Sequence, residues 1–231
     1  MNDEVGAKLE SELNADGQRA LYCHIDVTRE NEIAACVKKA VDTFGKVDTL
    51  INIACVMSVE TCYMHEVTEE MFEKDININF KGSFFFMKHA IPEMIKAGGG
   101  SIVSFSAVSA IRGMIGHSVY GAAKYGVESI TRMAATQYGR EGIRANCIRP
   151  GVMTNPTWEN TDFGRQYSGF MLSHMPAKRI GRASDAAPVV LFFASDDSRY
   201  VNGQTLTMDG GLTIHEPQWK EDLEMFEKGL R

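Results

Sequence analysis

The hydrophobic positions of this chain follow two periods in turn, the short apolar runs of buried strands and the wider spacing of amphipathic helices. The runs predict strands over 20–25, 48–54, 100–107, 144–149 and 205–208. The wider spacing predicts helices over 3–14, 30–44, 68–97, 118–138 and 184–195, with Thr28 placed to cap the second of them. Strands that alternate with helices are typical of a parallel sheet covered by helices on both faces. We therefore expect one α/β domain over residues 1–231, built on a doubly wound parallel sheet.

Two segments lie outside this alternation of strands and helices. The stretch 152–183 is rich in Met, Asn, Thr and Gly, and we expect it to form a mobile loop that contacts a substrate. Residues 213–231 form a tail in which Trp219, Leu223 and Phe226 recur at helical spacing. This tail is expected either to pack on a neighbouring subunit or to cover a pocket.

Composition excludes several classes of function. The net charge of −6, with no basic patch, argues against a nucleic-acid partner. No apolar run approaches the roughly 18 residues that span a bilayer, so a membrane partner is not expected. The five cysteines include no Cys-x-x-Cys pair and predict free thiols in a reducing cytoplasm. The six histidines have no metal-ligand spacing, so no metal site is expected.

The most informative motif is Tyr120-Gly-Ala-Ala-Lys124. Residues four apart share one face of a helix, so the ammonium of Lys124 would lie close to the phenol oxygen of Tyr120. A free tyrosine titrates near pH ~10, and a neighbouring cation lowers that pKa. The pair would form a proton relay suited to an alcohol or a ketone. Without its context, the same pair would indicate only an ordinary surface helix.

Several other motifs stand around this one in register. They are His24-Ile-Asp-Val-Thr28, Leu50-Ile-Asn-Ile-Ala-Cys55, Asn77-Ile-Asn-Phe-Lys-Gly82, Ser101-Ile-Val-Ser-Phe-Ser-Ala107, Gly142-Ile-Arg-Ala-Asn-Cys-Ile-Arg-Pro-Gly151 and Val201-Asn-Gly-Gln-Thr-Leu-Thr-Met-Asp-Gly-Gly211. In this order the set resembles the short-chain dehydrogenase/reductase family over about residues 3–212. The resemblance implies a Rossmann-like sheet, NAD or NADP as cofactor, a small-molecule alcohol or ketone as substrate, and a homo-oligomer, either a tetramer or a dimer.

The resemblance also assigns roles to residues that match the family's motifs. The catalytic residues would be Tyr120, Lys124 and Asn79, the last through a water that links Lys124 to solvent; otherwise Asn79 is only a helix-kink residue. Cofactor contacts would come from Tyr120 and Lys124 together with Asp26, Val27, Asn52, Ala54, Pro150, Val152 and Thr154. The substrate would contact Ala107, Ser109 and Met114.

The chain departs from the family at its start. The family opens with a strand, a glycine-rich turn and a helix that hold the dinucleotide pyrophosphate. Before Asp26 this sequence has only Gly6 and Gly17, and neither follows a predicted strand. The sequence thus predicts that the first βαβ unit is missing, through a misplaced start or a shortened protein. Dinucleotide binding is then in doubt, NAD and NADP stay undistinguished, and strand 48–54 would expose an unpaired edge.

Two further departures fall within the site. Ala107 stands where the family has a serine whose hydroxyl binds the substrate oxygen, and losing such a donor typically costs about 2.7–4 kcal/mol of barrier. Ser106 should point to the other side of its strand, whereas Ser109 in the following loop could replace the donor. Ile53 and Cys55 replace an asparagine and a glycine of the family's turn, unless they simply pack into the core.

These observations favour an NAD(P)-dependent oxidoreductase that interconverts a secondary alcohol and a ketone, with a bulky hydrophobic substrate. The alternative is a catalytically impaired member of the same fold that acts as a structural or regulatory subunit. Non-redox chemistry in the same pocket is a third possibility, but relatives of that kind replace the lysine with arginine, and Lys124 argues against it.

Overall fold

A four-stranded parallel sheet organises the residues that the computed structural model describes, 2–57 and 62–229. The strands are β1 (Thr49–Asn52), β2 (Gly100–Phe105), β3 (Ile143–Pro150) and β6 (Thr205–Met208), in the order β1-β2-β3-β6. A separate pair joins β4 (Met153–Thr154) to β5 (Gly181–Arg182) in parallel. The predicted strands 48–54, 100–107, 144–149 and 205–208 are confirmed as β1, β2, β3 and β6, and β3 is one residue longer at each end than predicted.

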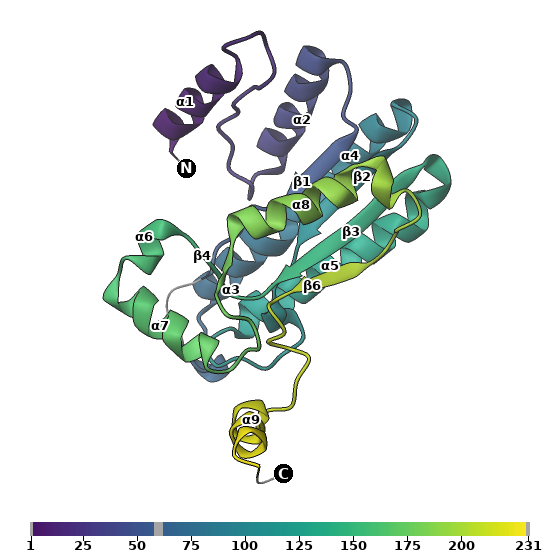
Figure 1. The fold of residues 1–231 in the computed structure, drawn as a ribbon. Coiled ribbons are helices and arrows are strands. Elements are labelled where there is room, and N and C mark those ends of the chain that lie inside the picture. Colours follow the sequence, from purple (N-terminus) through teal and green to yellow (C-terminus); the bar gives the residue numbers. More distant parts are fainter. Residues whose placement is uncertain (1, 58–61, 230–231) are drawn as a thin grey trace.

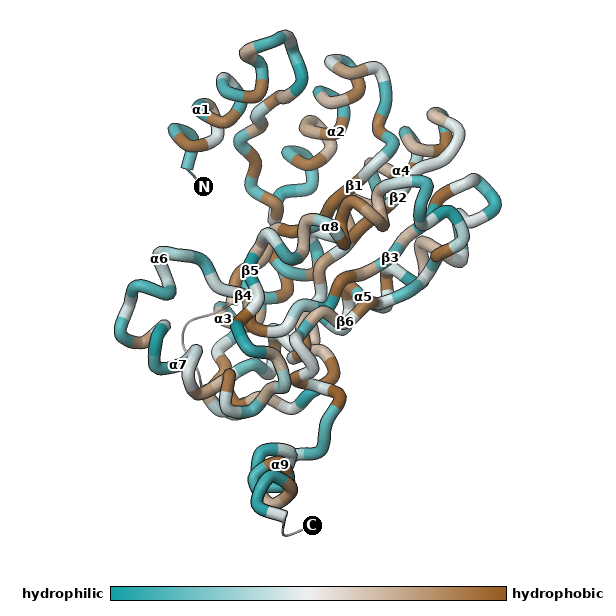
Figure 2. The backbone as a smooth tube through the Cα atoms, in the orientation of Figure 1, coloured by the Kyte–Doolittle hydropathy of each residue, from teal (hydrophilic) through white to brown (hydrophobic). Residues whose placement is uncertain are grey.

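Helices cover both faces of the sheet, as the strand–helix alternation predicts (Figure 1). On one face α4 (Gly82–Lys96) and α5 (Ser118–Tyr138) bury Ile102 of β2 and Ala145 of β3. On the other face α8 (Ala183–Ala194) places Phe193 against Val103 and Ile148. The brown segments in Figure 2 mark the same strands and α8 as the most hydrophobic parts of the fold. The two-sided burial follows from alternate side chains of one strand pointing to opposite faces.

The other helices lie around this core. Helices α1 (Asp3–Leu13) and α2 (Glu30–Phe44) agree with their predicted ranges, and α2 packs against α4. The predicted helix 68–97 is α3 (Glu69–Ile76), a π-helical turn at Asn77–Lys81, and then α4. Short 3₁₀ turns occupy Met64–Glu66, Val108–Ala110, Gly139–Glu141 and Asp196–Ser198. None of the helices in the described ranges has the length and apolar character needed to cross a bilayer.

The predicted strand 20–25 is wrong. This segment pairs with no strand among the described residues, and side chains bond part of its backbone instead. The side-chain oxygen of Asn14 accepts from the backbone of Arg19 and Ala20, and Glu10 accepts from the amide of Tyr22. Side chains of α1 and of its C-terminal cap thus satisfy amides that a neighbouring strand would otherwise bond. Thr28 does not cap α2 either, because its amide and hydroxyl both donate to Asp26.

The stretch 152–183 is more regular than the expected loop. Besides β4 and β5 it contains α6 (Pro156–Glu159) and α7 (Asp162–Leu172). The side chain of Asn155 caps α6 and that of Thr161 caps α7. The tail forms α9 (Trp219–Glu227), as the helical spacing of its apolar residues predicts. In Figure 1 α9 projects from the body of the domain.

Candidate active site

Tyr120 and Lys124 come together at the carboxyl end of β2. Both lie in the first two turns of α5, and the Lys124 ammonium is 5.7 Å from the centroid of the Tyr120 ring. That ammonium is buried and donates a 3.0 Å hydrogen bond to the carbonyl oxygen of Phe105. Ligands of parallel α/β sheets bind beyond the carboxyl ends of the strands. The predicted pair is therefore placed where such a fold binds its ligands.

The electrostatics of the pair differ from the expected lowering of the tyrosine pKa. Burial raises the pKa of Tyr120, and negative charge on Cys55 and Asp75 raises it further. Burial likewise lowers the pKa of the Lys124 ammonium, against the opposing effect of Cys55 and Cys147. The expectation failed because sequence spacing gives the cation's position but not the loss of water around the phenol. The raised pKa keeps the Tyr120 phenol in its neutral, proton-donating form at neutral pH.

Asn79 joins the site to the loop after β1. It is fully buried within the π-helical turn, and its Oδ1 accepts from the amide of Val56 at 3.0 Å. Its Nδ2 donates to the carbonyl oxygens of Val56 at 2.8 Å and Asp75 at 2.9 Å. π-Turns within helices are frequent at functional sites. Asn79 thus fixes the loop that carries Cys55, and its expected link to a water stays a prediction.

A buried ion pair supports α5 beneath the catalytic pair. Glu128 is 1% exposed and receives Arg149 Nε at 2.8 Å and Nη2 at 2.6 Å. The hydroxyl of Ser106 bonds the same carboxylate at 2.6 Å and the carbonyl oxygen of Lys124 at 3.1 Å. Arg149 also donates to the hydroxyl of Thr207 on β6. These contacts tie the helix turn that bears Lys124 to β3, to β6 and to the residue that follows β2.

The three expected substrate residues lie along the segment between β2 and α5. Ala107 precedes the 3₁₀ turn Val108–Ala110, in which Ser109 is buried, and Met114 follows half-buried. The ring of His117 meets the Tyr120 ring edge-on, with centroids 6.0 Å apart. Burial lowers the pKa of His117, so its imidazole is neutral at neutral pH. His117 and Asp75 are site residues that sequence reasoning missed.

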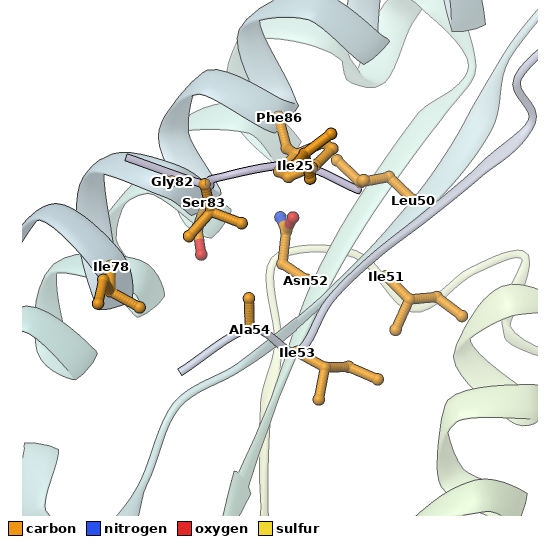
Figure 3. Close-up of a pocket in the computed structure, with 11 residues that line it drawn as sticks. Ile25, Leu50, Ile51, Asn52, Ile53, Ala54, Ile78, Gly82, Ser83 and Phe86 are labelled. Atoms are coloured by element: carbon orange, nitrogen blue, oxygen red, sulfur yellow. The ribbon is translucent and has the colours of Figure 1, made fainter. Parts of the chain in front are cut away.

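Three of the expected cofactor residues share a cavity of about 240 Å³ at the unpaired edge of β1. Val27, Asn52 and Ala54 line it together with Gly82, on which Val27 packs closely. In Figure 3 Asn52 points towards this space, while Ile53 points away from Ser83 and Phe86. Ile53 is 56% exposed and Cys55 is exposed, so the alternative that both pack into the core is wrong. The predicted exposure of this strand edge is confirmed.

The remaining expected cofactor residues are spread over two places. Asp26 is held by Thr28, whose amide and hydroxyl hydrogen bonds lower the pKa of its carboxyl group. Pro150 ends β3, and Val152 lines a separate cavity of about 560 Å³. The Thr154 hydroxyl is buried and donates to Glu159 at 2.6 Å. The structure thus brings Tyr120 and Lys124 together but does not gather all cofactor candidates in one cavity.

Comparison with known proteins decides the family. The family model described as Enoyl-(Acyl carrier protein) reductase matches residues 1–213. Momilactone A synthase of Oryza sativa subsp. japonica is 38% identical over 220 residues, which are 93% of this chain and 79% of that protein. The chain belongs to the short-chain dehydrogenase/reductase family. It is, by that membership, an NAD(P)-dependent oxidoreductase with a Rossmann-like fold.

Solved structures of short-chain dehydrogenases/reductases share this fold. The crystal structure of levodione reductase has a TM-score of 0.81 at 32% identity and covers 90% of this chain and 82% of that one. ElxO with NADP bound has a TM-score of 0.82 at 29% identity and covers 91% of this chain and 86% of that one. The fold class expected from the sequence is confirmed.

The described residues fit the nicotinamide end of a short-chain dehydrogenase/reductase cofactor. A buried ammonium from Lys124, beside the Tyr120 phenol, is a ready partner for sugar hydroxyls. Residues 2–57 and 62–229 contain no glycine-rich turn that joins a strand to a helix N-terminus, the usual support for a pyrophosphate. The described residues therefore offer contacts for the nicotinamide and its ribose, but no glycine-rich turn for the pyrophosphate.

The described residues also contain no group of three or more His, Cys, Asp or Glu side chains placed to bind a metal ion. In this short-chain dehydrogenase/reductase, sequence reasoning did not identify the contacts of Glu128 with Ser106 and Arg149 that support the helix turn of Lys124. Glu128 lies four residues after Lys124, on the same helix face. This spacing is the one signal in the sequence that a second charged side chain is buried beside Lys124.

Proposed function

We propose that this protein interconverts a secondary alcohol and a ketone, with Tyr120, Lys124 and Asn79 as its catalytic residues. The observation that carries the proposal is the half-buried Tyr120 phenol beside the buried Lys124 ammonium at the carboxyl end of β2. A raised Tyr120 pKa keeps the phenol protonated at neutral pH, which suits ketone reduction in particular.

The chain's own residues account for the proton. Tyr120 Oη gives its proton to the carbonyl oxygen as the carbon becomes tetrahedral, and takes one back from the alcohol in the reverse direction. Lys124 stabilises the phenolate that forms, because its positive charge lies over the ring. Asn79 holds the loop after β1 through Val56, which keeps Cys55 beside Tyr120. A bound nicotinamide cofactor would supply the hydride.

The substrate is proposed to be bulky and hydrophobic. Met171 and Met175 of the 152–183 stretch form a buried cluster with Ile180 and Leu212, against which Val152 and Tyr167 pack. Methionine side chains adapt to irregular apolar shapes. Besides this cluster, Trp158, Phe163, Tyr167 and Phe170 make a continuous series of ring contacts along α6 and α7. An apolar ring system, rather than a small polar ketone, matches these surroundings.

The test is a turnover assay of the purified protein with NADH or NADPH and a panel of carbonyl compounds. We expect reduction of bicyclic and polycyclic ketones, with kcat/KM at least about tenfold above that for acetone or acetoin. Equal kcat/KM for all compounds of the panel would contradict the proposal of a bulky hydrophobic substrate. No turnover of any member with either cofactor would contradict the catalytic proposal itself.

Ala107 favours a second candidate, a catalytically impaired subunit with a structural or regulatory role. The methyl group cannot donate a hydrogen bond to a substrate oxygen, and this lost donor is the strongest observation against turnover. This candidate predicts no turnover in the assay above, together with unchanged folding and assembly in Tyr120→Phe.

Assembly is proposed as a homo-oligomer, either a tetramer or a dimer, in the cytoplasm. Helices α4 and α5 form an apolar groove of about 410 Å³, with Phe84, Ile95 and Met133 all exposed. The five cysteines are free, as suits a reducing compartment. Light scattering should give a multiple of the 25.6 kDa chain mass, and Met133→Glu should lower the measured mass. Cell fractionation should recover the protein apart from the membranes.

A further inference from the structure

When hydride adds to a carbonyl carbon, negative charge develops on the carbonyl oxygen. Two hydrogen-bond donors stabilise that charge better than one. Tyr120 supplies one donor. Of the two serines near Ala107, Ser106 is already used, because its hydroxyl bonds Glu128 at 2.6 Å and the Lys124 carbonyl at 3.1 Å. Ser106 is therefore not free to bind a substrate.

Ser109 has the opposite character. Its side chain is 9% exposed, and its hydroxyl has no hydrogen-bond partner. Buried hydroxyl groups are nearly always paired, so an orphaned one calls for an explanation. Among the buried side-chain polar atoms of the described ranges, only Ser109 Oγ and His117 Nδ1 are in this condition. Both lie in the short segment that leads from β2 into the turn of Tyr120.

The backbone places Ser109 against the start of α5. Its carbonyl oxygen lies 2.6 Å, and its Cβ 3.8 Å, from the position that a Cβ on Gly121 would take. Gly121 directly follows Tyr120, so Ser109 packs on the helix turn that presents the phenol. Residues two apart are separated by at most about 7 Å, so Ser109 also stays within reach of the space beside Ala107.

We propose that Ser109 is a catalytic residue, whose hydroxyl donates a hydrogen bond to the substrate oxygen that receives the Tyr120 proton. It thereby performs the task that the Ala107 methyl group cannot. This inference rests on the proposed ketone reduction. Ser109 keeps its own proton throughout, and the proton found on the alcohol oxygen comes from Tyr120. Because Ser109 Oγ has no hydrogen-bond partner in the protein, the substrate oxygen would be the acceptor that this hydroxyl lacks.

Kinetics of a set of serine variants test the inference. Ser109→Ala should lower kcat for a bulky ketone by about 100-fold or more, with little change in KM. The double variant Ala107→Ser/Ser109→Ala should have a kcat at least about tenfold above that of Ser109→Ala, because the hydroxyl introduced at position 107 would supply the missing hydrogen-bond donor. The matched control is Ser101→Ala, a buried serine at the other end of β2 whose hydroxyl bonds the carbonyl oxygen of Phe193. It should retain kcat within about twofold.

Ser109→Ala with kcat within twofold of the parent would overturn the inference. If that variant does not fold by circular dichroism, Ser109→Cys replaces the strong donor by a weak one of similar shape, and the same loss is expected.

A second readout does not depend on turnover. A decalone labelled with ¹³C at its carbonyl is bound to the protein, and the carbonyl stretch is read by isotope-edited infrared difference spectroscopy. Loss of a donor should move this band to higher frequency in Ser109→Ala and not in Ser101→Ala. An unchanged band, or no bound-ketone band in the parent, overturns the role of Ser109. If the parent shows the shift but no turnover, the ketone reduction fails while the Ser109 contact stands.

Discussion

The ammonium of Lys124 donates a 3.0 Å hydrogen bond to the carbonyl oxygen of Phe105, the last residue of β2. This contact ties the cation to the end of the strand and leaves it over the Tyr120 ring, 5.7 Å from its centroid. The strand end, rather than the helix spacing alone, thus sets the distance between cation and phenol. The chemistry of the site depends on that placement.

The first prediction concerns pH. In the proposed mechanism the neutral phenol is the proton donor, and burial raises the pKa of Tyr120 above its ordinary value near pH ~10. Donor activity is present below the folded-state pKa and is lost as pH rises through it. The rate constant for ketone reduction should therefore stay level from about pH 7 to pH 10. A fall centred near pH ~8 would show a lowered tyrosine pKa instead.

The second prediction concerns the Glu128–Arg149 pair. Arg149→Met leaves a carboxylate that is 1% exposed without its cation, and breaking a buried pair in this way costs about 3–5 kcal/mol of unfolding free energy. Glu128→Leu/Arg149→Met removes both charges and should recover most of the loss in urea unfolding. A double variant as unstable as Arg149→Met would show that the pair's charges are not the cause.

The third prediction concerns the thiols. Burial raises the pKa of Cys147 to about 12 and that of Cys36 to about 11, so both remain protonated at pH ~8. Cys55 is exposed and close enough to Tyr120 to affect its pKa. Iodoacetamide at pH ~8 should label Cys55 well before Cys36 or Cys147, as read by peptide mass spectrometry, and should block turnover.

Cys55→Ser is the control for that experiment, because it removes the modified thiol and should make turnover resistant to the reagent. Inactivation of Cys55→Ser at the parental rate would place the sensitive thiol elsewhere.

The fourth prediction concerns Gly121. A methyl group at this position would lie 2.6 Å from the carbonyl oxygen of Ser109, closer than backbone atoms can approach. Gly121→Ala should therefore destabilise the protein and lower turnover, although alanine favours helices by about 1 kcal/mol over glycine. Gly169→Ala in α7 meets nothing within 4 Å and should instead be neutral or stabilising in thermal unfolding. A stabilised Gly121→Ala would contradict the close packing of Ser109 on α5.

The elements that local patterns define were predictable, and those that depend on neighbours were not. Helix α2 and strand β6 match the ranges that apolar spacing predicts. The segment 20–25 has strand-like residues, but the side chains of Asn14 and Glu10 bond part of its backbone. A strand exists only where another strand pairs with it, and a single sequence does not show that pairing.

The same limit applies to the site. The Tyr120–Lys124 pair was visible because helix spacing brings its members together. The partners that hold it were not, since Arg149 and Glu128 belong to different elements and meet only in the fold. The predicted direction of the Tyr120 pKa was wrong because burial, which the sequence does not display, raises it, and Cys55 and Asp75 raise it further. The exposure of Ile53 likewise reflects the unpaired edge of β1.

The most direct test of the central claim compares Tyr120→Phe with Tyr125→Phe in single-turnover ketone reduction. Both changes remove one hydroxyl from α5, but Tyr125 is exposed and contacts Arg132 rather than the catalytic lysine. If the Tyr120 phenol is the proton donor, Tyr120→Phe lowers the rate by about 100-fold or more while Tyr125→Phe retains it. Retained reduction in Tyr120→Phe, at a rate close to that of Tyr125→Phe, would contradict the account.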